Sequence, residues 1–185
     1  MRKLLTHCKE HFSGNKGTTL ECFAFGRGTL DWALGYWEHN YMVDIDDLKT
    51  QYLNNEFDRK DFILSSDRLV IAATTSGEKR PQYVDPDHPD FQATPAFLCS
   101  LASGRHLPID FPALGGVPMD GGKAVECFAP VRPDIKLTGK THLHDIYDKK
   151  GRSGRMIFIV VRLELFDESG EHLATTDSRL VIREK

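Results

Sequence analysis

The most telling absences in this 185-residue sequence concern charge and hydrophobic length. Acidic residues slightly outnumber basic ones, the net charge is −3, and nothing favours nucleic-acid binding, which needs a clustered basic surface. No apolar run approaches the ~20 residues that span a bilayer. The start, MRKLLTHCKEHFSGN, has only Leu4 and Leu5 behind its basic residues, which is too little for a secretory signal. We therefore expect a cytoplasmic protein with neither a nucleic-acid nor a membrane partner.

Several motifs that carry chemistry are missing too. The cysteines are widely spaced and form no C-x-x-C pair, as expected of reduced thiols; they are Cys8, Cys22, Cys99 and Cys127. His142 and His144 could share one face of a strand, but no third ligand is nearby, so we expect no metal. The sequence lacks a G-x-S-x-G nucleophile elbow, and FGRG at 25–28 lacks the third glycine of a phosphate-binding loop. We expect no cofactor.

The C-terminal part of the sequence has the pattern of antiparallel strands. Residues 123–131 form a short apolar-rich run, and residues 136–147 alternate between apolar and polar side chains. Residues 156–166 (MIFIVVRLELF) have one wholly apolar face, while the other face changes from apolar to charged along the strand. The turn DESG at 167–170 leads into a final strand at 172–183. Consecutive strands without helices between them predict an antiparallel sheet.

The first part of the sequence is more helical. We predict helices over 44–56, which has an Asp-rich start, and over 61–74, with Asp61 as cap and Gly77 as stop. The segment TPAFLCSLAS at 94–103 predicts a short apolar helix with Thr94 as its N-cap and the following proline at its first position. A helix this apolar is normally buried. An antiparallel sheet wrapped around it would give an α+β fold.

An aromatic-rich N-terminal extension precedes these elements. Six aromatic residues stand close together at its end: Phe23, Phe25, Trp32, Tyr36, Trp37 and Tyr41. This is too aromatic for a disordered tail. We expect two parts, an extension over 1–40 and a folded domain over 41–185, and leave the role of the extension open among lid, partner surface and core extension.

A rigid acidic loop at 75–91, TSGEKRPQYVDPDHPDF, is the main candidate for a catalytic segment. Its prolines and Asp-Pro steps mark a loop, and carboxylates beside a histidine are the groups used in general acid–base catalysis. The motif within this loop begins at Ser76-Gly77 and ends at Asp85-Pro86. Two other segments follow it: Asp120-Gly121-Gly122 before a short strand, and Pro130-Val131-Arg132-Pro133-Asp134 after that strand.

Together these segments resemble the MaoC-like, or FAS1-like, dehydratase family of hot-dog folds, particularly its N-terminal-half type, over about residues 45–183. In active members of that family, a Ser-Gly-Asp-x-Asn-Pro-x-His loop followed by Asp-Pro carries the catalytic aspartate and histidine. Here Glu78 stands where the family has the aspartate, and Tyr83 stands where it has the histidine. The resemblance implies a hot-dog fold, with an antiparallel sheet wrapped around a central helix at about 94–103.

The family reaction is the reversible dehydration of a 3-hydroxyacyl thioester to the 2-enoyl thioester. It needs an acid–base pair and stabilisation of the thioester oxygen as it gains charge. Tyr83 cannot replace a histidine as base near neutral pH, because the ordinary pKa of tyrosine is ~10. Glu78 is capable of acid–base work but is one methylene longer than aspartate. His88 would take part only with a register shift that breaks the Asp85-Pro86 alignment.

We therefore expect a helper half that binds an acyl-CoA or acyl-carrier-protein thioester beside a second, catalytic hot-dog subunit, as a homo- or heterodimer. Two alternatives stay open: a self-sufficient enoyl-CoA hydratase that uses Glu78, and an acyl-thioester binding protein or thioesterase. The resemblance makes Glu78 and Tyr83 the residues at the catalytic positions. It makes four residues candidates for substrate binding, namely Asp120, Gly121, Gly122 and Arg132. Lys136 is a further candidate for contacting a CoA or carrier phosphate.

Overall fold

The computed structural model describes residues 43–152 and 154–184, so the aromatic extension predicted at 1–40 lies outside the described residues. The elements, in chain order, are α1 (Ile45–Tyr52), β1 (Glu56–Ile63), α2 (Ser66–Thr75), α3 (Pro81–Val84), α4 (Pro95–Leu98), β2 (Val117–Cys127), β3 (Lys136–Gly151), β4 (Gly154–Phe166) and β5 (His172–Arg183). None of the helices in this part of the chain is both long enough and apolar enough to cross a membrane. Cys99 and Cys127, the two cysteines within it, are free thiols.

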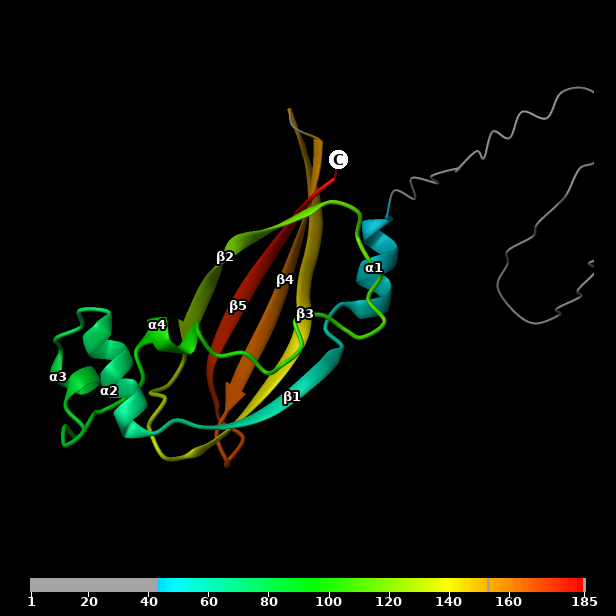
Figure 1. Ribbon diagram of the computed structural model, residues 1–185. Helices are drawn as coiled ribbons and strands as arrows, with labels where there is room; N and C mark the ends of the chain where they lie inside the picture. Colours follow the sequence, from blue (N-terminus) through cyan, green and yellow to red (C-terminus); the bar gives the residue numbers. More distant parts are fainter. Residues whose placement is uncertain (1–42, 153, 185) are drawn as a thin grey trace, which may run out of the picture. The chain divides into compact units, whose positions relative to one another are not determined.

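The five strands form one antiparallel sheet in the order β1-β3-β4-β5-β2, which confirms the predicted antiparallel sheet (Figure 1). β1 and β2 are its two edges. β5 has the predicted bounds, and β3 is longer than its predicted 136–147 because it continues into the hairpin with β4. β2 begins at Val117, earlier than the predicted 123–131.

One face of the sheet supplies most of the hydrophobic core. Along β3 the buried residues alternate from Leu137 to Leu143, and β4 buries Ile157, Ile159, Leu163 and Leu165 on the same face. Val160 on the opposite face is only 6% exposed, so β4 is buried on both sides there, as its apolar start predicts. Each fully buried Leu or Ile contributes about 1.5–3 kcal/mol to folding, so this face dominates stability.

The helices cover the two ends of this inner face. α1 packs Ile45 and Leu48 into a cluster with Ile146 and Ile157, whereas α2 and α4 place Leu69 and Leu98 in a second cluster near the opposite end of the sheet (Figure 1). α1 confirms the start of the helix predicted over 44–56 but ends earlier, at Tyr52. The Asp44 carboxylate accepts the Asp46 backbone N–H at 2.9 Å.

Two helix predictions need correction. The chain is still in β1 from Asp61 to Ile63, and the helix predicted over 61–74 begins only at Ser66. The helix predicted over 94–103 is a single turn, Pro95–Leu98. Its predicted N-cap is confirmed, because the Thr94 hydroxyl accepts the Phe97 N–H at 3.1 Å.

A non-helical segment, Cys99–His106, replaces the rest of that helix, and we call it the strap. It is tied to three strands: the Lys123 ammonium of β2 donates to the Cys99 carbonyl at 2.9 Å, and the Thr141 hydroxyl of β3 donates to the Ser103 hydroxyl at 2.7 Å. On β1, Asp58 accepts the Arg105 N–H at 2.8 Å. The strap therefore crosses the inner face of the sheet from one edge to the other.

Candidate functional site

The acidic loop after α2 holds Glu78 in a dense set of hydrogen bonds. The Arg80 guanidinium donates to the Glu78 carboxylate from Nε at 3.0 Å and from Nη2 at 2.6 Å. The backbone N–H groups of Lys79 and Arg80 add bonds of 2.9 and 3.0 Å. The Arg80 side chain, followed by these backbone N–H groups, lowers the pKa of Glu78 to about 2. Glu78 is therefore an ionised, fully engaged carboxylate at neutral pH.

The same arginine also covers Tyr83. Pro81 starts the one-turn helix α3, which places the Tyr83 ring 4.7 Å from the Arg80 guanidinium carbon. Arg80 stands at the position where the Ser-Gly-Asp-x-Asn-Pro-x-His motif has asparagine. The structure thus brings Glu78 and Tyr83 together through one guanidinium, which stays charged at every ordinary pH.

His88 and Arg132 build the far side of this loop. The His88 Nδ1 atom accepts the Asp90 N–H at 3.1 Å. Arg132, predicted to bind substrate, donates to the Pro89 carbonyl at 2.7 Å and pairs with the Asp90 carboxylate at 3.6 Å. Its guanidinium therefore holds the turn in place. Lys136, the other phosphate candidate, is paired with Asp61 on the neighbouring strand at 2.8 Å.

Asp120, Gly121 and Gly122 form a β-bulge in the edge strand β2. The register with β5 shifts between Asp120 and Lys123, and the Asp120 carboxylate accepts the Gly122 N–H at 2.8 Å. Gly122 has a φ of +88°, a left-handed conformation that favours glycine. Of the predicted site residues, Glu78, Tyr83 and Arg132 belong to the acidic loop region, whereas Asp120 lines a cavity beside the strap and Gly121 lines a different cavity, together with His144 and Tyr147.

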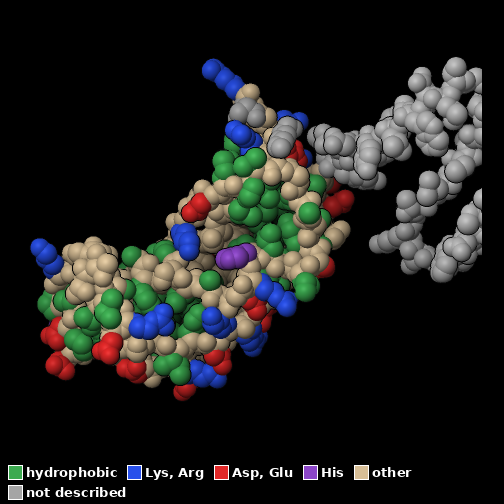
Figure 2. Space-filling view, in the orientation of Figure 1, with side chains coloured by type: hydrophobic (Ala, Val, Ile, Leu, Met, Phe, Trp, Pro, Cys, Tyr) green, Lys and Arg blue, Asp and Glu red, His purple; other side chains and the backbone are tan. Residues whose placement is uncertain are grey.

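The cavity beside the strap is a groove between this segment and the inner face of the sheet. It has an outer chamber of about 380 Å³ and an inner chamber of about 50 Å³. The residues that line both chambers are His106, Lys123, Val161 and Ser178. Apolar side chains gather in a hollow on this face of the molecule (Figure 2). Asp120 lines the outer chamber, but neither Glu78 nor Tyr83 lines either one.

Sequence reasoning missed most of the groove. Its polar wall comes from β5, where the run LATTDS places Thr176 and Ser178 two residues apart, and therefore on one face of a strand. The sequence did contain a signal for this wall, because these two hydroxyl side chains interrupt an otherwise apolar strand face. The contribution of the strap had no such signal, because its position depends on contacts with three separate strands.

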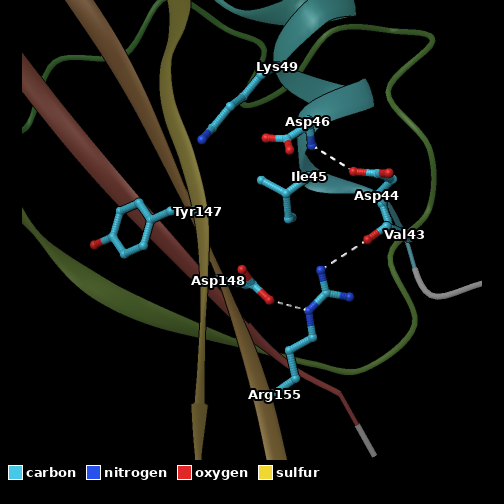
Figure 3. A pocket seen from close by; sticks show the side chains of 8 residues that line it. All are labelled: Val43, Asp44, Ile45, Asp46, Lys49, Tyr147, Asp148 and Arg155. Atoms are coloured by element: carbon cyan, nitrogen blue, oxygen red, sulfur yellow. Dashed lines mark hydrogen bonds and ion pairs between the residues drawn. The ribbon is translucent and has the colours of Figure 1, made fainter.

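Another cavity, of about 400 Å³, lies where α1 begins (Figure 3). Arg155, whose side chain is 12% exposed, pairs with Asp148 at 2.6 Å and donates to the Val43 carbonyl at 3.0 Å. It also pairs with Glu184 at 3.4 Å. Arg155 lowers the pKa of Asp148 through this contact. Because the guanidinium is engaged on three sides, Arg155 ties the start of α1 to β3 and to the C-terminal end. No three His, Cys, Asp or Glu side chains within residues 43–152 and 154–184 are placed to hold a metal ion.

Comparison with known proteins defines the family. Residues 51–176, more than half of the chain, match the family described as FAS1-like, dehydratase domain region. This chain therefore belongs to the FAS1-like dehydratase domain family, as the motifs around the acidic loop predict. Its relatives include UPF0336 protein SCO4636 of Streptomyces coelicolor, which is 30% identical over 123 residues, or 60% of this chain and 78% of that protein.

Two of the solved structures with a similar fold carry the name dehydratase. The MaoC-like dehydratase from Phytophthora capsici superposes with a TM-score of 0.58 at 22% identity, over 76% of this chain and 50% of that one. This chain thus spans half the length of that protein. The C-terminally truncated HadBC (3R-hydroxyacyl-ACP dehydratase) complex from Mycobacterium tuberculosis gives a TM-score of 0.51 at 17% identity, over 70% of this chain and 99% of that one. The predicted hot-dog fold is confirmed.

Proposed function

We propose that this chain is the non-catalytic half of a 3-hydroxyacyl-thioester dehydratase or enoyl-thioester hydratase. It binds the acyl part of an acyl-CoA or acyl-carrier-protein thioester beside a catalytic hot-dog subunit. The observation that carries the proposal is the state of Glu78. A carboxyl with a pKa of about 2 is protonated in about one molecule in 10⁵ at pH 7, whereas acid–base catalysis needs a group that titrates near the working pH.

The groove supports the binding half of this proposal. Its outer chamber of about 380 Å³ falls within the range of roughly 300–1,000 Å³ that small-molecule sites occupy. Leu107, Val161 and Leu180 give it apolar walls that suit an alkyl chain. Since the acidic loop does not reach the groove, this chain offers a place for the acyl group without offering the chemistry.

The edge strand β2 is the surface that we assign to the partner. The other edge, β1, exposes one apolar residue, Ile63, but it also carries four consecutive charged residues, Asp58 to Asp61, which discourage pairing with another strand. β2 instead exposes Val117 by 40% and Met119 by 38%. Because β2 also lines the groove, a subunit seated on it would lie at the groove mouth, where it could supply a catalytic aspartate and histidine. The HadBC structure, whose fold this chain shares, is likewise a complex of subunits.

The test compares the full chain alone with the chain mixed with a catalytic hot-dog subunit from the same genome that carries the complete Ser-Gly-Asp-x-Asn-Pro-x-His loop. Hydration of crotonyl-CoA and of longer enoyl-CoAs is followed by loss of enoyl-thioester absorbance. We expect the chain alone to be inactive and to raise the rate of its partner on long substrates, with saturation at a fixed stoichiometry. Turnover by the chain alone would contradict the proposal. So would a partner whose rate is the same with and without this chain. If the rate is unchanged but this chain still binds acyl-CoA, the results favour a binding protein.

A further inference from the structure

The inner chamber of the groove has a mixed lining, in which hydroxyl groups and the basic residues Arg105, His106 and Lys123 stand beside apolar side chains. Four hydroxyl side chains surround it: Ser103, Thr141, Thr176 and Ser178. Two of them are engaged with the protein, because Thr141 donates to Ser103 at 2.7 Å. Ser103 also faces Asp58, where it adds to the Arg105 N–H in lowering the pKa of that carboxyl. These contacts fix the strap and leave the other two hydroxyls for a ligand.

Thr176 is the more buried of the two remaining hydroxyls, since Ser178 is exposed. Its side chain is only 6% exposed and lines the inner chamber. It stands directly opposite Leu163 on β4, so the hydroxyl interrupts an apolar row. Ser178 lies beside it on the same face, opposite Lys123 of β2. The Lys123 ammonium has three N–H donors, and one of them bonds to the Cys99 carbonyl.

A plain alkyl chain in the inner chamber would displace water from the buried Thr176 hydroxyl without offering it a hydrogen-bond partner. Burying an unsatisfied donor or acceptor in this way lowers affinity by roughly five- to a hundredfold. An oxygen atom carried by the chain would instead accept from the Thr176 hydroxyl or the Lys123 ammonium. The chamber of about 50 Å³ has room for one such small substituent.

We propose that the inner chamber is a subsite for an oxygen-bearing substituent, such as a hydroxyl or keto group, on the body of the bound acyl chain, away from the thioester. This inference rests on the proposed function, because it takes the groove to be the acyl site. It makes oxygenated acyl thioesters, rather than plain saturated ones, the preferred ligands of this chain. Thr176 is the residue that determines this specificity.

The test measures dissociation constants of the full chain, with and without its catalytic partner, for hexadecanoyl-CoA and a series of its monohydroxylated isomers. We expect one or two adjacent hydroxyl positions to bind about three- to tenfold more tightly than the plain chain. Thr176→Val should abolish that preference. The matched control is Thr175→Val, which removes an equally buried hydroxyl, 5% exposed, from the opposite face of β5, where its neighbour is Glu164. This variant should keep the preference.

The outcomes separate the two claims. Equal binding of plain and hydroxylated chains by the wild type would overturn the subsite and leave the proposed function standing. Loss of the preference in Thr175→Val to the same degree as in Thr176→Val would also overturn it, since the effect would then belong to β5 as a whole. Failure of every acyl-CoA to bind, with or without the partner, would instead overturn the proposed function. Thermal unfolding of each variant checks that it is folded.

Discussion

Replacement of Arg80 by glutamine should release the Glu78 carboxylate from the contact that keeps it ionised. The substitution removes two of the four donors to that carboxylate, together with the nearby positive charge. The backbone N–H groups at positions 79 and 80 remain. We therefore expect the pKa of Glu78 to rise from about 2 toward, but not fully to, the ordinary value of 4.5.

The sign of the accompanying change in stability follows from linkage. Because the pKa of Glu78 in the folded protein lies below the ordinary value, the unfolded chain binds more protons between about pH 4.5 and pH 2. The Glu78 contribution to stability is therefore complete above about pH 4.5 and is lost as the pH falls toward 2. In Arg80→Gln that loss should span a narrower range, closer to pH 4.5.

NMR titration of the carboxyl carbon of Glu78 measures this pKa directly. The matched control is Arg59→Gln, because Arg59 makes a similar fork to Glu56 with bonds of 2.8 and 3.0 Å. The control should raise the pKa of Glu56, which Arg59 also lowers, and leave that of Glu78 in place. A wild-type Glu78 that titrates near 4.5 would refute the reasoning, and so would an equal rise in both variants.

Two further predictions concern the stability of the scaffold, measured by urea unfolding. Thr94→Ala should cost about 1 kcal/mol, because its hydroxyl caps α4 through the Phe97 N–H, whereas Thr94→Ser should cost much less; equal losses would rule out the cap as the cause. Gly139→Ala should cost about 1–3 kcal/mol, because the new methyl group would lie 2.5 Å from the Phe62 ring. Gly115→Ala is its control, since nothing lies within 4 Å of the added carbon; an unchanged Gly139→Ala protein would show that the β1–β3 contact is loose.

The C-terminal strands could be predicted because each side chain's position depends on a short-range alternation that burial enforces. β5 occupies the predicted 172–183, and the inward residues of β3 are those of the predicted apolar face. β1 could not be found in this way. It is an edge strand in which only Phe62 is buried, so its charged residues hide the alternation and let Asp61 look like a helix cap.

The strap shows a second reason why part of the fold could not be predicted from the sequence. Its apolar residues follow a good N-cap and first-turn proline, so the local signals favour a longer helix than Pro95–Leu98. The side chains of Asp58, Lys123 and Thr141 compete with that preference, and they come from strands far away in the sequence. The contact between Arg80 and Glu78, in contrast, has a signal in the sequence, because an arginine two residues after Glu78 replaces the asparagine of the family loop.

Glu78→Gln in the reconstituted pair tests the central claim most directly. In this chain, Glu78 occupies the position of the family's catalytic aspartate, and the variant removes its carboxylate. The catalytic subunit keeps its own aspartate and histidine. The account predicts that hydration of a long enoyl-CoA by the pair continues at close to the wild-type rate, and that replacing the aspartate of the catalytic subunit abolishes it. Loss of activity in Glu78→Gln with the pair still assembled would contradict the account, because Glu78 would then be taking part in the chemistry.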